Sequence, residues 1–256
     1  MRPAFGVLLA IAATTVLDAS GLAVVSALPL FPLMGLFWYL ERLSRTDLGF
    51  VWGRRPDYLL ALLHPGLVLG LVALIALIAN VINLEGADWR KAGFNWVVVT
   101  LSTVLVATVT EEGFFRGWLW SSLKRSGQNK LRVLLWSSLA FAAWHLPAVL
   151  LKTGFNPPLT QVPIYLANVA VLGAIWGMLR LISGSVIVPS VSHGLWNGGA
   201  YVFFGFGDKV GTLGIQETTM YGPEVGVIGL ALNLGFAIVL WHCCKCKRPL
   251  QPFNYA

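Results

Sequence analysis

The stretch Thr110–Trp120, TEEGFFRGWLW, places two adjacent carboxylates and an arginine at the end of an apolar run that begins near Trp96. A charged side chain at membrane depth costs about 3 kcal/mol on insertion scales, so these groups need partners, water or a chemical role. Glu112 and Arg116 are four residues apart on a helix, and we expect them to pair on one face. Glu111 is turned by about 100° from Glu112 and is free to face a cavity as an acid. A purely structural ion-pair cluster is the alternative for this stretch.

Two later apolar segments carry side chains that acid–base chemistry uses together with a carboxylate. His145 follows Phe141 by one helical turn, so the phenyl ring can flank the imidazole. His193 and Asn197 also lie four residues apart, among small residues that let another helix or a substrate backbone come close. Each residue alone is also explained by hydrogen bonding between helices. Their joint occurrence on separate apolar segments predicts a functional site, because ionisable residues inside membrane segments are functional candidates by default.

The composition predicts an all-α membrane protein. The chain has 256 residues, of which 57% are hydrophobic and 11% are charged, whereas about 25% are charged in a typical soluble domain. Long apolar runs, without ten-residue alternating strands, indicate helical spans. No length is left for a separate soluble domain, so residues 1–256 are expected to form one integral-membrane domain. The basic residues behind the net charge of +7 lie in short loops, which favours a lipid bilayer as the partner and disfavours nucleic acid.

The elements that must position these residues are about eight spans of a polytopic transmembrane helical bundle. The expected spans are about 4–16, 21–40, 58–84, 94–120, 131–151, 162–182, 186–206 and 225–241. The site then lies among spans four, five and seven, within a motif-bearing core of about 94–206. An even number of spans puts both termini on one side, and the excess of Lys and Arg there makes it the cytoplasmic side. A single bent element is the alternative for the first segment.

Two further polar groups are interpreted as lying outside the site. His64 comes near the start of the third span and is interpreted as a headgroup or helix-terminus residue. Cys243, Cys244 and Cys246 follow His242 in a cationic sequence, HCCKCKRP, after the last apolar run. We interpret it as an unmodified basic tail, with S-acylation or a metal ion as the alternatives.

Three motifs carry a resemblance to a known family. EEGFFR (Glu111–Arg116), FAAWH (Phe141–His145) and HGLWN (His193–Asn197) resemble, in the same order and on separate apolar segments, the motifs of the CAAX-protease and bacteriocin-processing family of intramembrane proteases. The similarity extends from about Asp47 to Asn197. It implies an endopeptidase that cleaves membrane-associated peptides or proteins, prenylated or leader peptides among them.

The resemblance also implies a role for each motif residue. Glu111 is similar to the family's general base, which polarises a water together with His145. His193 and Asn197 are similar to the groups that donate hydrogen bonds to the oxyanion. The ion pair of Glu112 and Arg116 holds the helix in place, and Phe141 supports His145.

Two alternatives stay open at this point. Glu111, His145 and His193 have the ligand types of a His₂Glu zinc site, but the chain has no HExxH pair, so we favour a site without a cofactor. A non-catalytic membrane scaffold or immunity protein that binds a peptide or membrane partner is the alternative to an enzyme. A transporter is disfavoured because no internal repeat is visible. The compact chain favours a prokaryotic plasma membrane.

Overall fold

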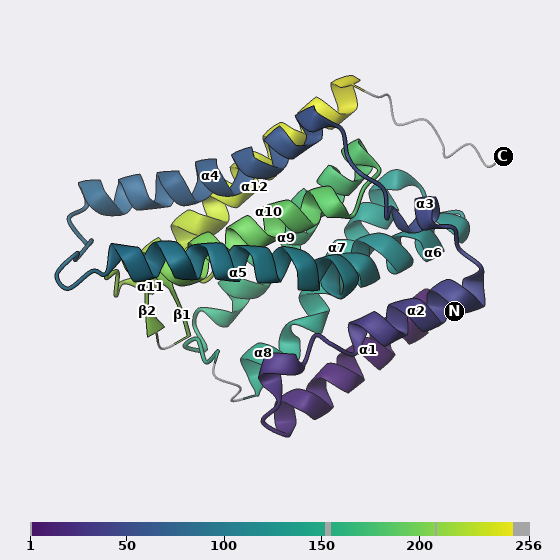
Figure 1. Cartoon of the computed structure of the whole chain (residues 1–256), viewed down its shortest axis with the longest axis horizontal. Coiled ribbons are helices and arrows are strands. Elements are labelled where there is room, and N and C mark those ends of the chain that lie inside the picture. Colours follow the sequence, from purple (N-terminus) through teal and green to yellow (C-terminus); the bar gives the residue numbers. More distant parts are fainter. Residues whose placement is uncertain (1, 152–154, 208, 248–256) are drawn as a thin grey trace.

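The computed structural model describes the whole chain except residues 1, 152–154, 208 and 248–256, so Arg248 and Pro249 of the expected basic tail lie outside the described residues, whereas its first part continues helix α12. Long apolar helices form a bundle with short connections (Figure 1). The elements are α1 (Arg2–Ala19), the 3₁₀-helix η1 (Ala23–Val25), α2 (Leu30–Glu41), α3 (Arg45–Leu48), α4 (Arg55–Ile78), α5 (Trp89–Val109), the π-helix η2 (Glu112–Leu119), α6 (Trp120–Arg125), α7 (Lys130–Trp144), α8 (Leu146–Leu150), α9 (Val162–Ser183), α10 (Ile187–Gly199), the π-helix η3 (Ala200–Phe204), β1 (Gly205–Phe206), β2 (Lys209–Val210), α11 (Thr218–Tyr221) and α12 (Val227–Lys247).

Seven helices in the described part of the chain are long and apolar enough to cross a membrane, by length and composition. The first two expected spans are separate, since α1 and α2 flank the short η1 turn. The expected count of eight exceeds the count of seven because the segment 186–206 is not one regular helix. Its 13-residue α10 passes at Ala200 into the five-residue π-helix η3, which leads into a two-stranded hairpin.

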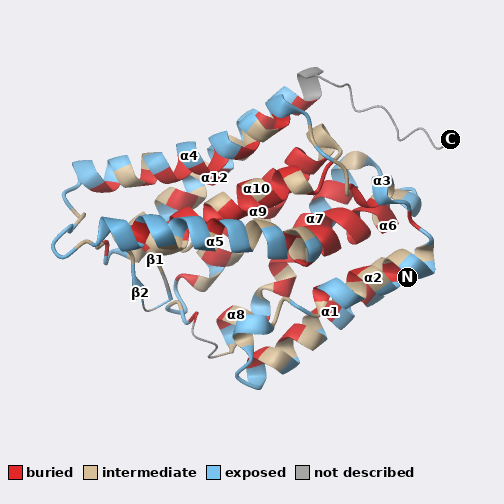
Figure 2. Ribbon diagram, in the orientation of Figure 1, coloured by how far each residue is buried: buried red, intermediate tan, exposed pale blue. Residues whose placement is uncertain are grey.

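Buried residues gather on α9, α10 and η2, whereas α1, α4 and α5 turn exposed faces outward (Figure 2). Those outward faces are apolar: Leu8, Leu77 and Leu105 are all more than half exposed. Apolar outward faces are what lipid-exposed helices require. The bundle therefore has a packed interior, which holds the polar residues of interest, and an apolar outside.

Glycines on α10 set how closely α5 approaches it. A Cβ atom at Gly194 would overlap Val104 Cγ2, and one at Gly198 would overlap Thr100 Oγ1. Small residues at such a crossing let two helix backbones come close. The small residues around His193 therefore admit a neighbouring helix, α5, and through it bring the carboxyl end of α5 next to the imidazole.

Candidate active site

The two glutamates lie where the regular hydrogen bonding of a long helix changes. Helix α5 ends at Val109, and Glu112–Leu119 form the π-helix η2, with hydrogen bonds that reach one residue further than in an α-helix. Such π-helical turns occur frequently at functional sites. All eight residues of η2 are buried. Glu111, just before them, keeps 17% of its side chain exposed.

Glu112 and Arg116 form an ion pair inside the bundle. Arg116 Nη1 lies 3.3 Å from Glu112 Oε1, and neither side chain has any exposed surface. Arg116 Nη2 donates a hydrogen bond of 3.1 Å to the carbonyl oxygen of Gly173 on α9. The guanidinium also lies 4.2 Å from the ring centroid of Phe141, in the geometry of a cation–π contact. One arginine thus links η2, α7 and α9.

The imidazole of His193 lies between the two glutamates. Its Nδ1 is 3.1 Å from Glu112 Oε1, and its Nε2 is 3.9 Å from Glu111 Oε2. The Trp176 ring stacks on the imidazole of His193, with ring centroids 4.0 Å apart and planes at 15°. Since Glu112 Oε1 is already paired with Arg116 and accepts hydrogen bonds, Nδ1 of His193 carries a proton.

His145 directly follows the last residue of α7. Its Nδ1 lies 2.9 Å from the carbonyl oxygen of Phe141, which can only accept, so Nδ1 donates. The neutral ring then keeps a lone pair on Nε2. The Phe141 ring touches His145 edge to face at 4.5 Å and lies 6.4 Å from the ring of His193. Phe141 thus flanks His145 as expected and also lies near the ring of His193.

Asn197 lies one turn beyond His193 on α10 and is partly exposed. The structure therefore brings Glu111, Glu112, Arg116 and His193 into direct contact and connects His145 to them through Phe141. Across the described residues, no group of three His, Cys, Asp or Glu side chains has an arrangement that would hold a metal ion.

The interpretation of His64 as a headgroup or helix-terminus residue is wrong. His64 is fully buried, with Nδ1 3.0 Å from Ser192 Oγ and Nε2 3.0 Å from Asn233 Oδ1. Although a serine, a histidine and an asparagine in series resemble a hydrolase triad, all three are fully buried. Trp196 stacks on the imidazole, with ring centroids 5.3 Å apart. The group is a polar core between α4, α10 and α12.

Glu224 also escapes detection from the sequence, because it lies in no motif and follows α11 in a short loop. Trp196 Nε1 donates a hydrogen bond of 3.1 Å to Glu224 Oε1. Burial raises the pKa of Glu224 to about 7, while the hydrogen bond from Trp196 and the charge of His193 act to lower it. A third carboxyl therefore contacts α10, three residues along the helix from His193. The only hint in the sequence is Trp196 itself, a buried indole that requires an acceptor.

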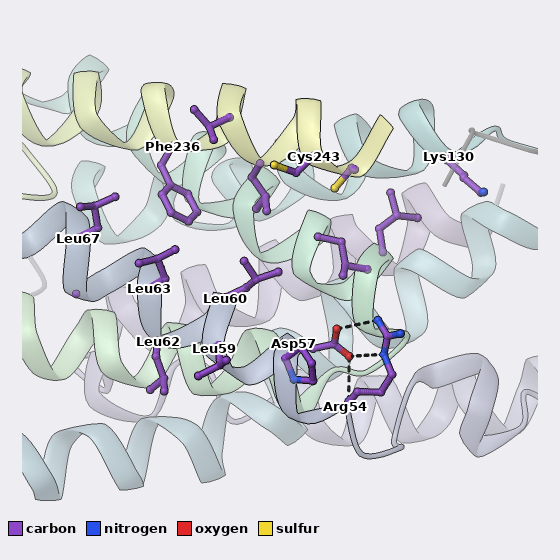
Figure 3. Close-up of a pocket in the computed structure, with 17 residues that line it drawn as sticks. Arg54, Asp57, Leu59, Leu60, Leu62, Leu63, Leu67, Lys130, Phe236 and Cys243 are labelled. Atoms are coloured by element: carbon purple, nitrogen blue, oxygen red, sulfur yellow. Dashed lines mark hydrogen bonds and ion pairs between the residues drawn. The ribbon is translucent and has the colours of Figure 1, made fainter. Parts of the chain in front are cut away.

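A groove of about 1060 Å³ lies away from these residues, between α4 and α12 (Figure 3). Leucines of α4 and Phe236 of α12 form its walls, and the ion pair of Arg54 with Asp57 lies at one end. It shares no residue with the site, so its volume says nothing about catalysis.

The fold and the site define an integral membrane protein with an acid–imidazole cluster inside its helical bundle. Residues 93–199 match the family model described as type II CAAX prenyl endopeptidase Rce1-like. The matched segment contains all three motifs, and it supports the resemblance of this part of the chain to the CAAX-protease and bacteriocin-processing family. Over these residues the chain is similar, in general terms, to CAAX-type intramembrane proteases. No curated protein matches the chain.

Proposed function

We propose that this protein is an intramembrane endopeptidase that uses Glu111 as the general base in hydrolysing a peptide bond of a membrane-associated substrate. The observation that carries the proposal is the contrast between the two glutamates. Glu112 is fully buried and paired with Arg116, whereas Glu111 is partly exposed and lies beside the Nε2 atom of His193. One acid is neutralised and the other is available to a water molecule.

Glu111 and His145 together suit the activation of water. A carboxylate accepts a proton, and the Nε2 lone pair of His145 accepts a hydrogen bond from the same water. In this step a proton passes from water to Glu111 while the water oxygen bonds to the carbonyl carbon of the substrate. When the carbon–nitrogen bond breaks, that proton passes to the departing amine.

Helix α10 supplies the groups that stabilise the oxyanion. The carbonyl oxygen becomes negatively charged as water attacks, and donors fixed in advance at that position lower the barrier. The Asn197 amide donates whatever the pH. His193 donates through Nε2 when that nitrogen is protonated, since Nδ1 is engaged by Glu112. Both side chains come from one face of one helix, which fixes their spacing.

No step in this mechanism requires a metal ion. We therefore expect purified protein to keep its activity after dialysis against a chelator and into metal-free buffer. Activity that is lost on this treatment and restored by zinc would replace the Glu111 mechanism with a zinc mechanism. We also expect a prokaryotic plasma membrane, with both termini cytoplasmic, which requires α10 and η3 to complete an eighth crossing.

The decisive experiment compares newly formed peptide termini, by mass spectrometry, in membranes that contain equal amounts of wild type, Glu111→Gln or His145→Ala. We expect a set of termini with wild type that both variants lack, and these termini would name the substrates as well. Glu217→Gln is the matched control, because Glu217 is an exposed glutamate at the start of α11. It should leave the set unchanged.

The scaffold alternative predicts a different outcome. Termini would then be the same with wild type and Glu111→Gln, and Glu111→Gln would still complement loss of the gene. Prenylated C-terminal peptides, bacteriocin leaders and other membrane proteins are all candidate substrates, and the termini would distinguish among them.

A further inference from the structure

We propose that the groove between α4 and α12 is a binding site for one phospholipid with an anionic headgroup. The groove has a volume of about 1060 Å³, at the upper end of the range of about 300–1,000 Å³ that is usual for ligand sites. It lies apart from the candidate active site, so the inference does not depend on the proposed function. Three features carry it: the apolar walls, the position along the helices and the charge at one end.

The walls of the groove are apolar side chains that face away from the core of the bundle. Leu59, Leu63 and Leu67 repeat every four residues along α4, and each exposes between 44% and 66% of its surface. Phe236 and Val239 line the opposite wall on α12. Residues four apart share one face of a helix, so the leucines form a continuous strip. This strip suits the acyl chain of a lipid that runs parallel to the helix.

The groove extends along one half of α4. The helix runs from Arg55 to Ile78 and is long and apolar enough to cross a membrane. The residues of α4 that line the groove begin next to Arg54 and end at Leu67, in the middle of the helix. Thirteen steps along a helix cover about 20 Å, and one leaflet with its headgroups is about 20–22 Å thick. The groove therefore has the length of one phospholipid, from the headgroup region to the centre of the bilayer.

Basic side chains lie at the end of the groove where the helices α4 and α7 begin. Arg54 and Lys130 both line this end, together with Asp57 (Figure 3). Nε and Nη2 of Arg54 donate to the Asp57 carboxylate at 3.2 and 3.0 Å, which uses two of the five N–H donors of the guanidinium. The Arg54 side chain is still 67% exposed. Two cations and one carboxylate leave one positive charge in excess, at the level where a headgroup would lie.

The excess charge decides which lipid the groove prefers. Lipid tails are as apolar as leucine side chains, so an acyl chain gains little by leaving the bulk lipid for the groove. Selectivity must then come from the headgroup, and basic pockets between transmembrane helices bind anionic headgroups. One basic side chain in excess at a membrane surface corresponds to a preference of about fivefold. A zwitterionic headgroup would bring its own cation next to the two basic side chains.

Gly66 keeps the middle of the groove open. It lines the groove on α4, and no atom lies within 4 Å of a Cβ placed on it. Gly70, one turn further along α4, also has open space around its Cβ but lies beyond the groove. A large side chain at position 66 would take the volume of the acyl chain, whereas the same side chain at position 70 would extend into bulk lipid. The two glycines thus give a blocking variant and a matched control.

The first experiment measures the headgroup preference. Purified full-length protein is stripped of lipid in detergent and titrated with phosphatidylglycerol or with phosphatidylcholine of the same acyl chains, and native mass spectrometry counts the bound lipids. We expect one phosphatidylglycerol to bind about five times more tightly than phosphatidylcholine. Lys130→Gln should abolish this preference, whereas Arg132→Gln, at an exposed arginine of α7 outside the groove, should keep it. Equal affinity of wild type for the two lipids would overturn the inference.

The second experiment tests whether the lipid lies in the groove. We expect Gly66→Trp to weaken the binding of phosphatidylglycerol at least tenfold and Gly70→Trp to bind it as wild type does. Melting curves without lipid establish that both variants are folded. Full retention of the lipid by folded Gly66→Trp would show that it binds elsewhere.

Photo-crosslinking of wild type gives the same answer without any substitution. Phosphatidylglycerol with a diazirine in its acyl chain should label residues 59–67 of α4 and 236–243 of α12, as mapped by peptide mass spectrometry. Labels confined to other helices would overturn the inference, even where Gly66→Trp fails to fold.

Other occupants of the groove would give other results. Displacement of phosphatidylglycerol by a prenylated peptide, but not by the same peptide without its prenyl group, would assign the groove to a substrate. A dimer in the native spectra that Gly66→Trp dissociates would assign it to a second copy of the chain. Either result would replace the lipid site. None of these measurements uses peptide cleavage, so the protease proposal and the lipid site can fail independently.

Discussion

Replacing Arg116 by methionine removes the guanidinium that pairs with Glu112 and leaves a carboxylate inside the bundle. Methionine retains much of the apolar stem, so the change is chiefly one of charge. Breaking a buried ion pair by removing one partner costs about 3–5 kcal/mol. Loss of the contact with the Phe141 ring adds up to about 2 kcal/mol. The hydrogen bond from His193 Nδ1 still reaches Glu112 and offsets part of the loss.

These terms together predict a loss of about 4 kcal/mol in the free energy of unfolding for Arg116→Met. Native proteins are stable by only about 5–15 kcal/mol, so folded yield should fall sharply. Glu112→Gln should also destabilise, because it leaves Arg116 unpaired. The double variant should lose less than the sum of the two by about 2 kcal/mol, since it buries no unpaired charge.

Reversible unfolding in mixed detergent micelles, followed by circular dichroism, measures all three variants and the coupling energy. Arg132→Met is the matched control, because Arg132 is an exposed arginine on α7. It should leave stability within about 0.5 kcal/mol. If the two single changes are additive, or if Arg116→Met is as stable as the control, the ion pair does not hold η2 in place.

Three further expectations concern single positions. Asn197→Ala should lower kcat by about 10²–10³ at unchanged folded yield, measured on a cleaved peptide; an unaltered kcat would remove Asn197 from the oxyanion site. Gly198→Ala should lower the free energy of unfolding by about 1–3 kcal/mol, because the added Cβ overlaps Thr100. Gly70→Ala is the control, because the space around its Cβ is open. Equal melting temperatures of the two variants would contradict the prediction. Asn233→Leu should cost about 1–3 kcal/mol, because its hydrogen-bond partners stay buried, and an unchanged unfolding free energy would refute that role.

Local spacing predicted the part of the site that lies on single helices. The spacing of Glu112 and Arg116 predicted their ion pair, and the spacing of Phe141 and His145 predicted their contact. Both are interactions between residues four apart, which depend on helix geometry and little else. The class of fold was predicted for a similar reason, since apolar composition alone requires helices in a bilayer.

Contacts between distant segments could not be predicted. His64 meets Ser192 and Asn233 across 128 and 169 residues of sequence, and no local pattern indicates such partners. Glu224 lies in a loop, where the sequence gives no sign of its contact with Trp196. The expected count of eight spans overlooked the change of hydrogen bonding at Ala200, because hydropathy records how apolar a segment is and not its hydrogen-bond pattern.

The π-helix η2 changes which face of the long helix Trp89–Arg125 is directed inward. Residues Trp89–Arg125 run without a break, but the wider turns of η2 offset the faces after it from those before it. The α5 part can therefore direct Thr100 and Ala107 inward, while the later part directs Trp120 and Ser121 into a different interface. Glu111 lies at the point where the phase changes. The two parts of the long helix therefore each bury a face of their own, while Glu111 between them stays partly exposed beside His193.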